Sequence, residues 1–255
     1  MYDKLLIFGD SFGEEEAHHL KIHQRYSEEY LSLKSYHSIL KSSKIFKHIE
    51  NYAMGGADVF SQFKIFLDKY TGKEKILWFA TNPNRITIPH PTDPKGLPYP
   101  LVGKNFAQFM LSQIEQGHEK YLDDHAKKIF QAAVYYYDCL LRPDFDDYVY
   151  TKLFEDIEKK VENDLWIIPC FRTVRFSKYA LMDVYLKESK SIGFDVERDQ
   201  EKYIDIRRNH MVDENHEVLA QQIINYFQKG SKFDISLFKT PSKKDFDKYI
   251  KLRHA

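Results

Sequence analysis

Three short, mostly apolar segments place the strongest constraint on how this chain can fold. Each is shorter than a typical buried helix and lacks an alternation of polar and apolar residues, so each predicts a strand buried on both faces. A fourth strand is predicted over residues 46–52, where a turn of small residues follows. The three apolar segments are residues 4–8, 75–80 and 165–169.

Segments with the spacing of amphipathic helices lie between these strands. Residues 27–40 have this spacing, and Asp58 is the expected N-cap of the helix that follows the second strand. Strands that alternate with helices predict a parallel sheet covered on both faces. The expected fold class is therefore α/β, a three-layer α/β/α sandwich with a central parallel sheet. Further helices are expected over residues 105–141, 144–162 and 213–227.

The length of 255 residues suits one large domain, which we predict over residues 1–229. Residues 83–103 hold six of the nine prolines and are expected to form a loop or lid without regular structure. Together with the helices after it, this loop makes a largely helical insertion over residues 86–162. Residues 230–255 form a basic extension that is expected to pack through Phe238, Phe246 and Tyr249.

The composition argues against several classes of partner. The 38 basic and 38 acidic residues cancel, which disfavours nucleic acid or an anionic membrane as the main partner. Cys139 and Cys170 provide no disulfide framework and no metal-ligand spacing, which fits a reducing compartment. The sequence shows no signal peptide and no membrane-spanning segment, so a cytoplasmic protein is expected. Release with a virus particle would leave no such signal either.

The first three strands all end in residues suited to a functional site. Ligands of open α/β sheets bind at the carboxyl ends of the strands. Taken alone, Ser11 fits a helix N-cap as well as a nucleophile, and Asp10 is expected to brace its turn through hydrogen bonds. The three strand ends carry Gly9-Asp10-Ser11, Gly55-Gly56-Ala57 and Thr81-Asn82-Pro83.

These segments, together with one near the C-terminus, resemble the four sequence blocks of the SGNH/GDSL hydrolases in the family's order. Residues 6–11 resemble the block with the nucleophilic serine, and residues 51–56 the block whose glycine donates an N–H group to the oxyanion. Residues 80–83 resemble the block with the asparagine donor, and residues 207–220 the block whose catalytic histidine precedes the closing helix. The resemblance implies the family's flavodoxin-like fold and a serine esterase that needs no cofactor or metal.

The resemblance also implies a role for each matched residue. Ser11 would be the nucleophile, and its backbone N–H, the Gly56 N–H and the Asn82 amide would bind the oxyanion. The chemistry requires these residue types, because a serine hydroxyl must lose its proton to a base before it attacks. The tetrahedral intermediate then needs hydrogen-bond donors aimed at its oxyanion.

Two histidines compete for the role of general base. Asp213 and His216 have the literal Asp-x-x-His spacing of the last block. In the family, however, the catalytic histidine lies before the closing helix, which favours His210 and leaves His216 as a partly buried packing residue. Arg207 stands three positions before His210, so the acid stays open between Asp205, Asp213 and none, with a backbone carbonyl orienting the imidazole in the last case.

Other charged residues allow two interpretations each. Arg207 and Arg208 are either surface charges or a clamp for an anionic group of the substrate. His19 and His23 are spaced like metal ligands, but no third ligand is specified and a solvated polar segment is favoured.

The expected function is hydrolysis of a carbohydrate O-acetyl ester or another short acyl ester through an acyl-Ser11 intermediate. The tyrosine-rich and proline-rich insertion favours a carbohydrate. The alternative keeps the fold without turnover, as a ligand-binding module or as a structural protein in virion assembly. Pro83 and Arg207, where the chain departs from the family pattern, motivate that alternative.

Overall fold

The computed structural model describes about three fifths of the chain, including the four parallel strands of its central sheet. The described residues are 1–10, 13–14, 34–55, 57–81, 85–88, 99–101, 104–117, 123–161, 164–169, 211–231, 233–239, 244 and 248.

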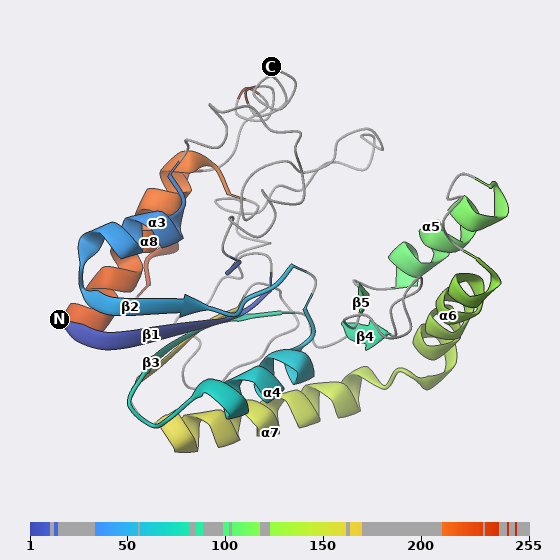
Figure 1. The fold of residues 1–255 in the computed structure, drawn as a ribbon, viewed down its shortest axis with the longest axis horizontal. Coiled ribbons are helices and arrows are strands. Elements are labelled where there is room, and N and C mark those ends of the chain that lie inside the picture. Colours follow the sequence, from blue (N-terminus) through green and yellow to red (C-terminus); the bar gives the residue numbers. More distant parts are fainter. Residues whose placement is uncertain are drawn as a thin grey trace.

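A four-stranded parallel sheet forms the centre of the structure (Figure 1). Its strands are β1 (Tyr2–Gly9), β2 (Phe46–Asn51), β3 (Lys75–Ala80) and β6 (Leu165–Pro169), in the order β2-β1-β3-β6. The register pairs Ile7 with Asn51 and Gly9 with Phe79, so the first three strands end close together. All four predicted strands are therefore confirmed, and so is the predicted parallel sheet.

Both faces of the sheet are buried, because successive side chains point to opposite sides of each strand. Leu5, Ile7 and Phe79 pack with α3 (Tyr36–Ser43) and α8 (Asp213–Lys229). On the other face, the core contains side chains from the strands, from α4 (Val59–Lys69) and from α7 (Pro143–Val161), including Leu6, Phe8, Trp78, Phe66 and Phe154. Figure 1 shows the two pairs of helices on opposite sides of the sheet. The chain thus has an α/β fold that is compatible with a three-layer sandwich.

The helix starts follow local capping chemistry. The Asp58 carboxylate accepts a hydrogen bond from the Ser61 N–H at 2.9 Å, which confirms the predicted N-cap of α4. Ser35 caps α3 in the same way through the Ser38 N–H at 3.1 Å. Because α3 begins only at Tyr36, the predicted helix over residues 27–40 is wrong for residues 34 and 35, and residues 27–33 lie outside the described residues.

The prediction that residues 83–103 lack regular structure is wrong in part. β4 (Ile86–Ile88) and β5 (Tyr99–Leu101) form a short antiparallel pair in which Thr87 lies opposite Pro100. Proline is tolerated here because each strand of a two-stranded sheet is an edge strand, with a side that needs no ladder hydrogen bond. The segment was predicted to be a loop because it contains many prolines.

The rest of the predicted insertion divides into two parts. The helices α5 (Lys104–Glu115) and α6 (Asp124–Tyr135), with the π-helix η1 (Tyr136–Leu140), pack with β4 around a small core of their own. Figure 1 shows this part beyond the carboxyl ends of the strands. α7, by contrast, packs on the sheet.

The described part of the basic extension packs against the sheet domain. It contains a 3-10 helix, η4 (Ile235–Leu237), and Phe238 is 5% exposed in the core beside α8, as predicted. Phe246 and Tyr249 lie outside the described residues. Among the helices that the structure describes, none combines the length and apolar character needed to cross a membrane.

Candidate active site

The structure describes the neighbours of three predicted site residues. Ser11, Gly56, Asn82, Asp205, Arg207, Arg208 and His210 all lie outside the described residues, as do His18, His19 and His23. The neighbours of the first three are described, however, and they show how the strand ends are held together.

The end of β1 is built around Gly9, whose backbone has a φ of 127°. A Cβ atom at this position would lie 2.1 Å from the carbonyl oxygen of Phe79 on β3, so only glycine fits. The Gly9 N–H donates to the Gln62 side-chain oxygen on α4 at 2.9 Å, and the Gly9 carbonyl accepts from the Met54 N–H at 3.1 Å. Both polar groups of the Gly9 backbone are therefore fixed, two residues before Ser11.

A hydrogen-bonded turn spans the position of Ser11. The Gly13 N–H donates to the Asp10 carbonyl at 2.9 Å, which closes a four-residue turn from Asp10 to Gly13. The Gly13 carbonyl accepts from the Asn51 side-chain amide at 2.7 Å and from the Tyr36 hydroxyl. A Cβ atom on Gly13 would lie 2.5 Å from the Phe79 ring. The chain is thus anchored on both sides of Ser11.

The segment after β2 is tied to this turn. The Glu14 carboxylate is 6% exposed and accepts a hydrogen bond from the Gly55 N–H at 2.8 Å. Hydrogen bonds from the Tyr52 N–H to the Ile7 carbonyl and from the Ala53 N–H to the Asn51 side chain hold the same segment. Gly55 directly precedes Gly56, so Glu14 links the segment that contains the nucleophile candidate to the one that contains an oxyanion candidate.

The segment after β3 is tied to the same turn by an ion pair. Arg85 Nη1 lies 3.3 Å from Asp10 Oδ2, and Asp10 is fully buried while Arg85 is 9% exposed. At the other side of the Asn82 position, the Thr81 carbonyl accepts from the Tyr150 hydroxyl at 2.5 Å. The Asp10 carboxylate therefore ties the end of β1 to the segment after β3, through an arginine that the sequence analysis did not single out.

Thr81 contributes a buried polar atom at this edge of the sheet. Its hydroxyl oxygen is buried and has no hydrogen-bond partner in the part of the chain that the structure describes. Buried hydroxyls nearly always have a partner, and a missing one calls for an explanation.

Tyr137 on η1 borders the segment after β3. Burial and the neighbouring Tyr136 raise the pKa of Tyr137 to about 12, while a backbone hydrogen bond at Ile86 and the charge of Arg85 oppose the rise. The phenol is therefore neutral throughout the physiological range. Tyr137 also packs with the apolar residues around Ile86 and Ile88, so part of the insertion borders the candidate site.

His216 is a buried residue with a structural hydrogen bond. Its Nδ1 accepts from the Tyr36 N–H at 3.1 Å, and its ring lies parallel to the Tyr36 ring with 6.3 Å between the centroids. With Nδ1 accepting, the proton of the neutral imidazole sits on Nε2. The general base of a serine hydrolase needs the opposite tautomer. His216 is 1% exposed, so the prediction of a partly buried packing residue understated its burial.

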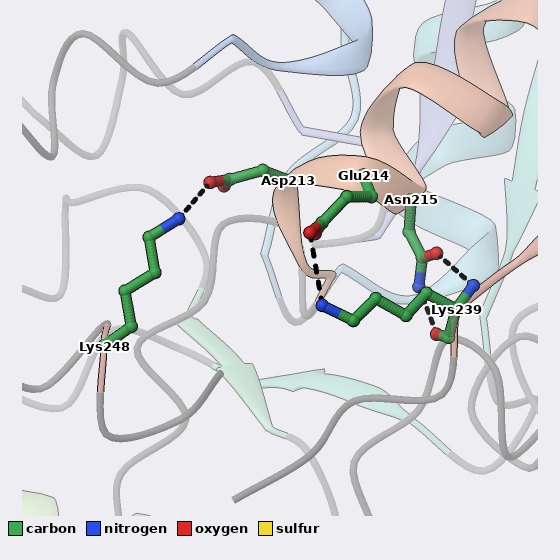
Figure 2. Close-up of polar contacts among 5 residues, drawn as sticks. All are labelled: Asp213, Glu214, Asn215, Lys239 and Lys248. Carbon is green, nitrogen blue, oxygen red and sulfur yellow. Dashed lines mark hydrogen bonds and ion pairs between the residues drawn. The ribbon is translucent and has the colours of Figure 1, made fainter. Parts of the chain in front are cut away.

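The first turn of α8 binds the C-terminal extension (Figure 2). Asp213 accepts from Lys248 Nζ at 3.0 Å, and Glu214 from Lys239 Nζ at 3.2 Å. The Asn215 side chain bonds both backbone groups of Lys239, at 2.7 Å and 2.9 Å. This turn starts three residues after His210, so the extension holds the helix that follows the predicted general base.

Glu14 and Arg85 are the site residues that sequence reasoning missed. Glu14 was not singled out, because its partner Gly55 lies 41 positions away and no local pattern links them. Arg85 is separated from Asp10 by 75 positions. The one available signal was the departure from the family pattern after Asn82, where a charged residue soon follows Pro83.

No protein-family model matches this chain, and no curated protein matches it in sequence. Among the described residues there is also no group of three histidine, cysteine, aspartate or glutamate side chains that could hold a metal ion.

Proposed function

We propose that this protein is a serine esterase of the SGNH type, with Ser11 as nucleophile and His210 as general base. The observation that carries the proposal is the cross-linking of three strand ends by buried polar contacts. Glu14 joins the first end to the second through Gly55, and Asp10 joins the first to the third through Arg85. A parallel sheet with helices on both faces is also what the family resemblance implies.

The proposed reaction is an acyl transfer in two steps. His210 takes the Ser11 hydroxyl proton while Ser11 Oγ attacks the ester carbonyl, and the same proton then goes to the departing alcohol. Water, deprotonated by His210, attacks the acyl-enzyme and releases the acid and free Ser11. The Ser11 and Gly56 N–H groups and the Asn82 amide would hold the oxyanion in both steps.

The substrate that we propose is a short acyl ester, with a carbohydrate O-acetyl group as first choice. The insertion beside the strand ends supplies aromatic side chains, among them Tyr137, which has a hydrogen bond to the backbone at Ile86. A hydrogen-bonding group of the substrate or a bound water would also satisfy the buried Thr81 hydroxyl.

Hydrolysis of p-nitrophenyl acetate and of an acetylated monosaccharide, together with covalent labelling by a fluorophosphonate, tests this proposal. We expect Ser11→Ala to abolish hydrolysis and labelling, and Asn82→Ala to lower kcat by about 10²–10³-fold. Ser42→Ala is the matched control, because Ser42 is exposed and its hydroxyl bonds only locally, to the Ser38 carbonyl.

Two results would contradict the proposal. If the wild-type protein and Ser11→Ala are equally inert toward all esters and toward the fluorophosphonate, the protein is a binding or structural module instead. If the wild type is active and Ser11→Ala retains that activity, another residue is the nucleophile.

A further inference from the structure

We propose that Arg85 is a positioning residue of this site, which acts through its ion pair with Asp10. The pair connects the turn that contains Ser11 to the segment that contains Asn82, and so fixes the nucleophile relative to the side-chain oxyanion donor. This inference rests on the proposed function.

The first argument is the burial of both charges. Asp10 is 0% exposed and the Arg85 side chain 8%, and the two approach to 3.3 Å. Removing two charges from water costs free energy that their attraction offsets only in part, so buried ion pairs contribute little net stability compared with apolar residues. Such a pair is better explained by the geometry that it imposes, because a buried charge holds its partner in one place.

The second argument is the spacing of the anchors around Asn82. On one side, the Thr81 carbonyl is held by the Tyr150 hydroxyl at 2.5 Å; on the other, Arg85 is held by Asp10. Only three residues, 82–84, lie between these anchors. The Tyr150 bond and the ion pair therefore hold the described residues, Thr81 and Arg85, that flank this segment.

The third argument is that the partner of Arg85 is itself rigidly placed. The Asp10 carbonyl closes the turn with the Gly13 N–H, and the preceding Gly9 is bonded through both of its backbone groups. A guanidinium bound to Asp10 is therefore held in a fixed position relative to the end of β1. Asp10 directly precedes Ser11.

Loss of the ion pair should affect the transition state more than substrate binding. The oxyanion develops only during the reaction, so a displaced Asn82 lowers kcat and leaves KM nearly unchanged. Displacements of about 1 Å in an active site cost up to roughly 10²-fold in rate.

Five variants test the inference: Arg85→Met, Arg85→Lys, Asp10→Asn, the double variant Asp10→Asn/Arg85→Met, and Lys75→Met. The readouts are kcat and KM for p-nitrophenyl acetate, the rate of fluorophosphonate labelling, and the thermal midpoint. Lys75→Met is the control, since it breaks an ion pair with Asp164 at the start of β3, the end of that strand away from Arg85.

We expect Arg85→Met to lower kcat by about 10–100-fold with KM changed less than about two-fold. Arg85→Lys should restore part of kcat, because it keeps the charge. The double variant removes both charges and should fold with a near wild-type midpoint while kcat stays low. Lys75→Met should leave kcat unchanged.

A wild-type kcat and labelling rate in Arg85→Met or in the folded double variant would overturn this inference alone. An equal loss of kcat in Lys75→Met would also overturn it, because the effect would then follow general destabilisation. A wild-type protein that neither hydrolyses esters nor labels at Ser11 would overturn the proposed function and this inference with it.

Discussion

The imidazole of His216 accepts a hydrogen bond from the backbone N–H of Tyr36, the first residue of α3, although 180 positions separate the two residues. The first N–H groups of a helix lack partners within the helix. His216 supplies one of these partners from α8, and both residues are almost completely buried. The bond therefore joins two helices on the same face of the sheet.

This bond predicts separate effects for the two candidate histidines. His216→Ala should lower the free energy of unfolding by about 2–4 kcal/mol, because it leaves a buried N–H unpaired and opens a cavity. His216→Asn should recover part of that loss, since its side-chain oxygen can accept the same bond. His210→Ala should abolish ester hydrolysis without comparable destabilisation. Urea unfolding and the kcat of the folded fraction measure the two effects, and a stable His216→Asn variant without activity would reverse the assignment.

Gly9 should be among the least replaceable residues of the chain. Gly9→Ala places a Cβ atom 2.1 Å from the Phe79 carbonyl oxygen at a φ of 127°, so we expect a loss of at least about 3 kcal/mol or failure to fold. Gly72→Ala is a matched control: φ is 95° there, but nothing lies within 4 Å of the added carbon. It should cost only about 1 kcal/mol. Equal losses in the two variants, measured by urea unfolding, would show that backbone strain matters and the contact with β3 does not.

Glu14 should influence activity through the Gly55 N–H. Glu14→Ala leaves this partly buried N–H without its acceptor, at a cost of about 1 kcal/mol, and should lower kcat by about ten-fold as the neighbouring Gly56 loses its support. Glu14→Gln retains an acceptor oxygen and should keep most of the kcat. Steady-state kinetics with p-nitrophenyl acetate checks both, and unchanged kcat in Glu14→Ala would contradict the assigned role.

Glu74, which lies at the end of the sheet opposite the candidate site, should make the free energy of unfolding depend on pH. Burial alone would raise the pKa of Glu74, but hydrogen bonds from the Thr71 hydroxyl and from the Thr71 and Lys73 N–H groups outweigh it and lower the pKa below 4.5. A lowered pKa in the folded state adds stability above the pKa of the unfolded state, and that stability is lost as pH falls through the folded pKa.

Accordingly, Glu74→Gln should cost roughly 1–2 kcal/mol at pH 7, with the difference from wild type shrinking below about pH 5. Urea unfolding between pH 3 and 7 measures this. An exposed residue such as Glu217, replaced in the same way, should change stability little at any pH. A difference that persists unchanged to pH 3 would rule out ionisation as its cause.

The buried strands were predictable because their residues are apolar on both faces. The predicted bounds of β3 and β6 agree with the structure, whereas β1 also includes Tyr2 and Asp3, which the apolar pattern left out. Tyr2 lies opposite Phe46 on β2. Residues at the end of a strand, such as Tyr2, join it through backbone hydrogen bonds, which a hydropathy pattern does not reveal. The β4–β5 pair was missed because proline-rich segments are usually loops.

The contacts that organise the candidate site could not be predicted from the sequence. Asp10 was expected to brace its turn, yet neither Arg85 nor the Glu14–Gly55 bond follows from any local spacing. These partners lie close together only because three parallel strands end side by side. The connections between those strands are long and differ in length. A short motif predicts the residue types at each strand end, while the contacts among those ends depend on the whole fold.

The bond between His216 and Tyr36 also bears on the order in which the chain is completed during synthesis. β1 precedes the other strands of the sheet in the chain, yet α8, the helix that covers it together with α3, follows all four strands. Until residues 213–229 emerge, the apolar side chains of Leu5, Ile7 and Leu40 lack the cover that α8 provides. The nascent chain therefore exposes part of its future core until α8 has been made, a state in which chaperone binding competes with aggregation.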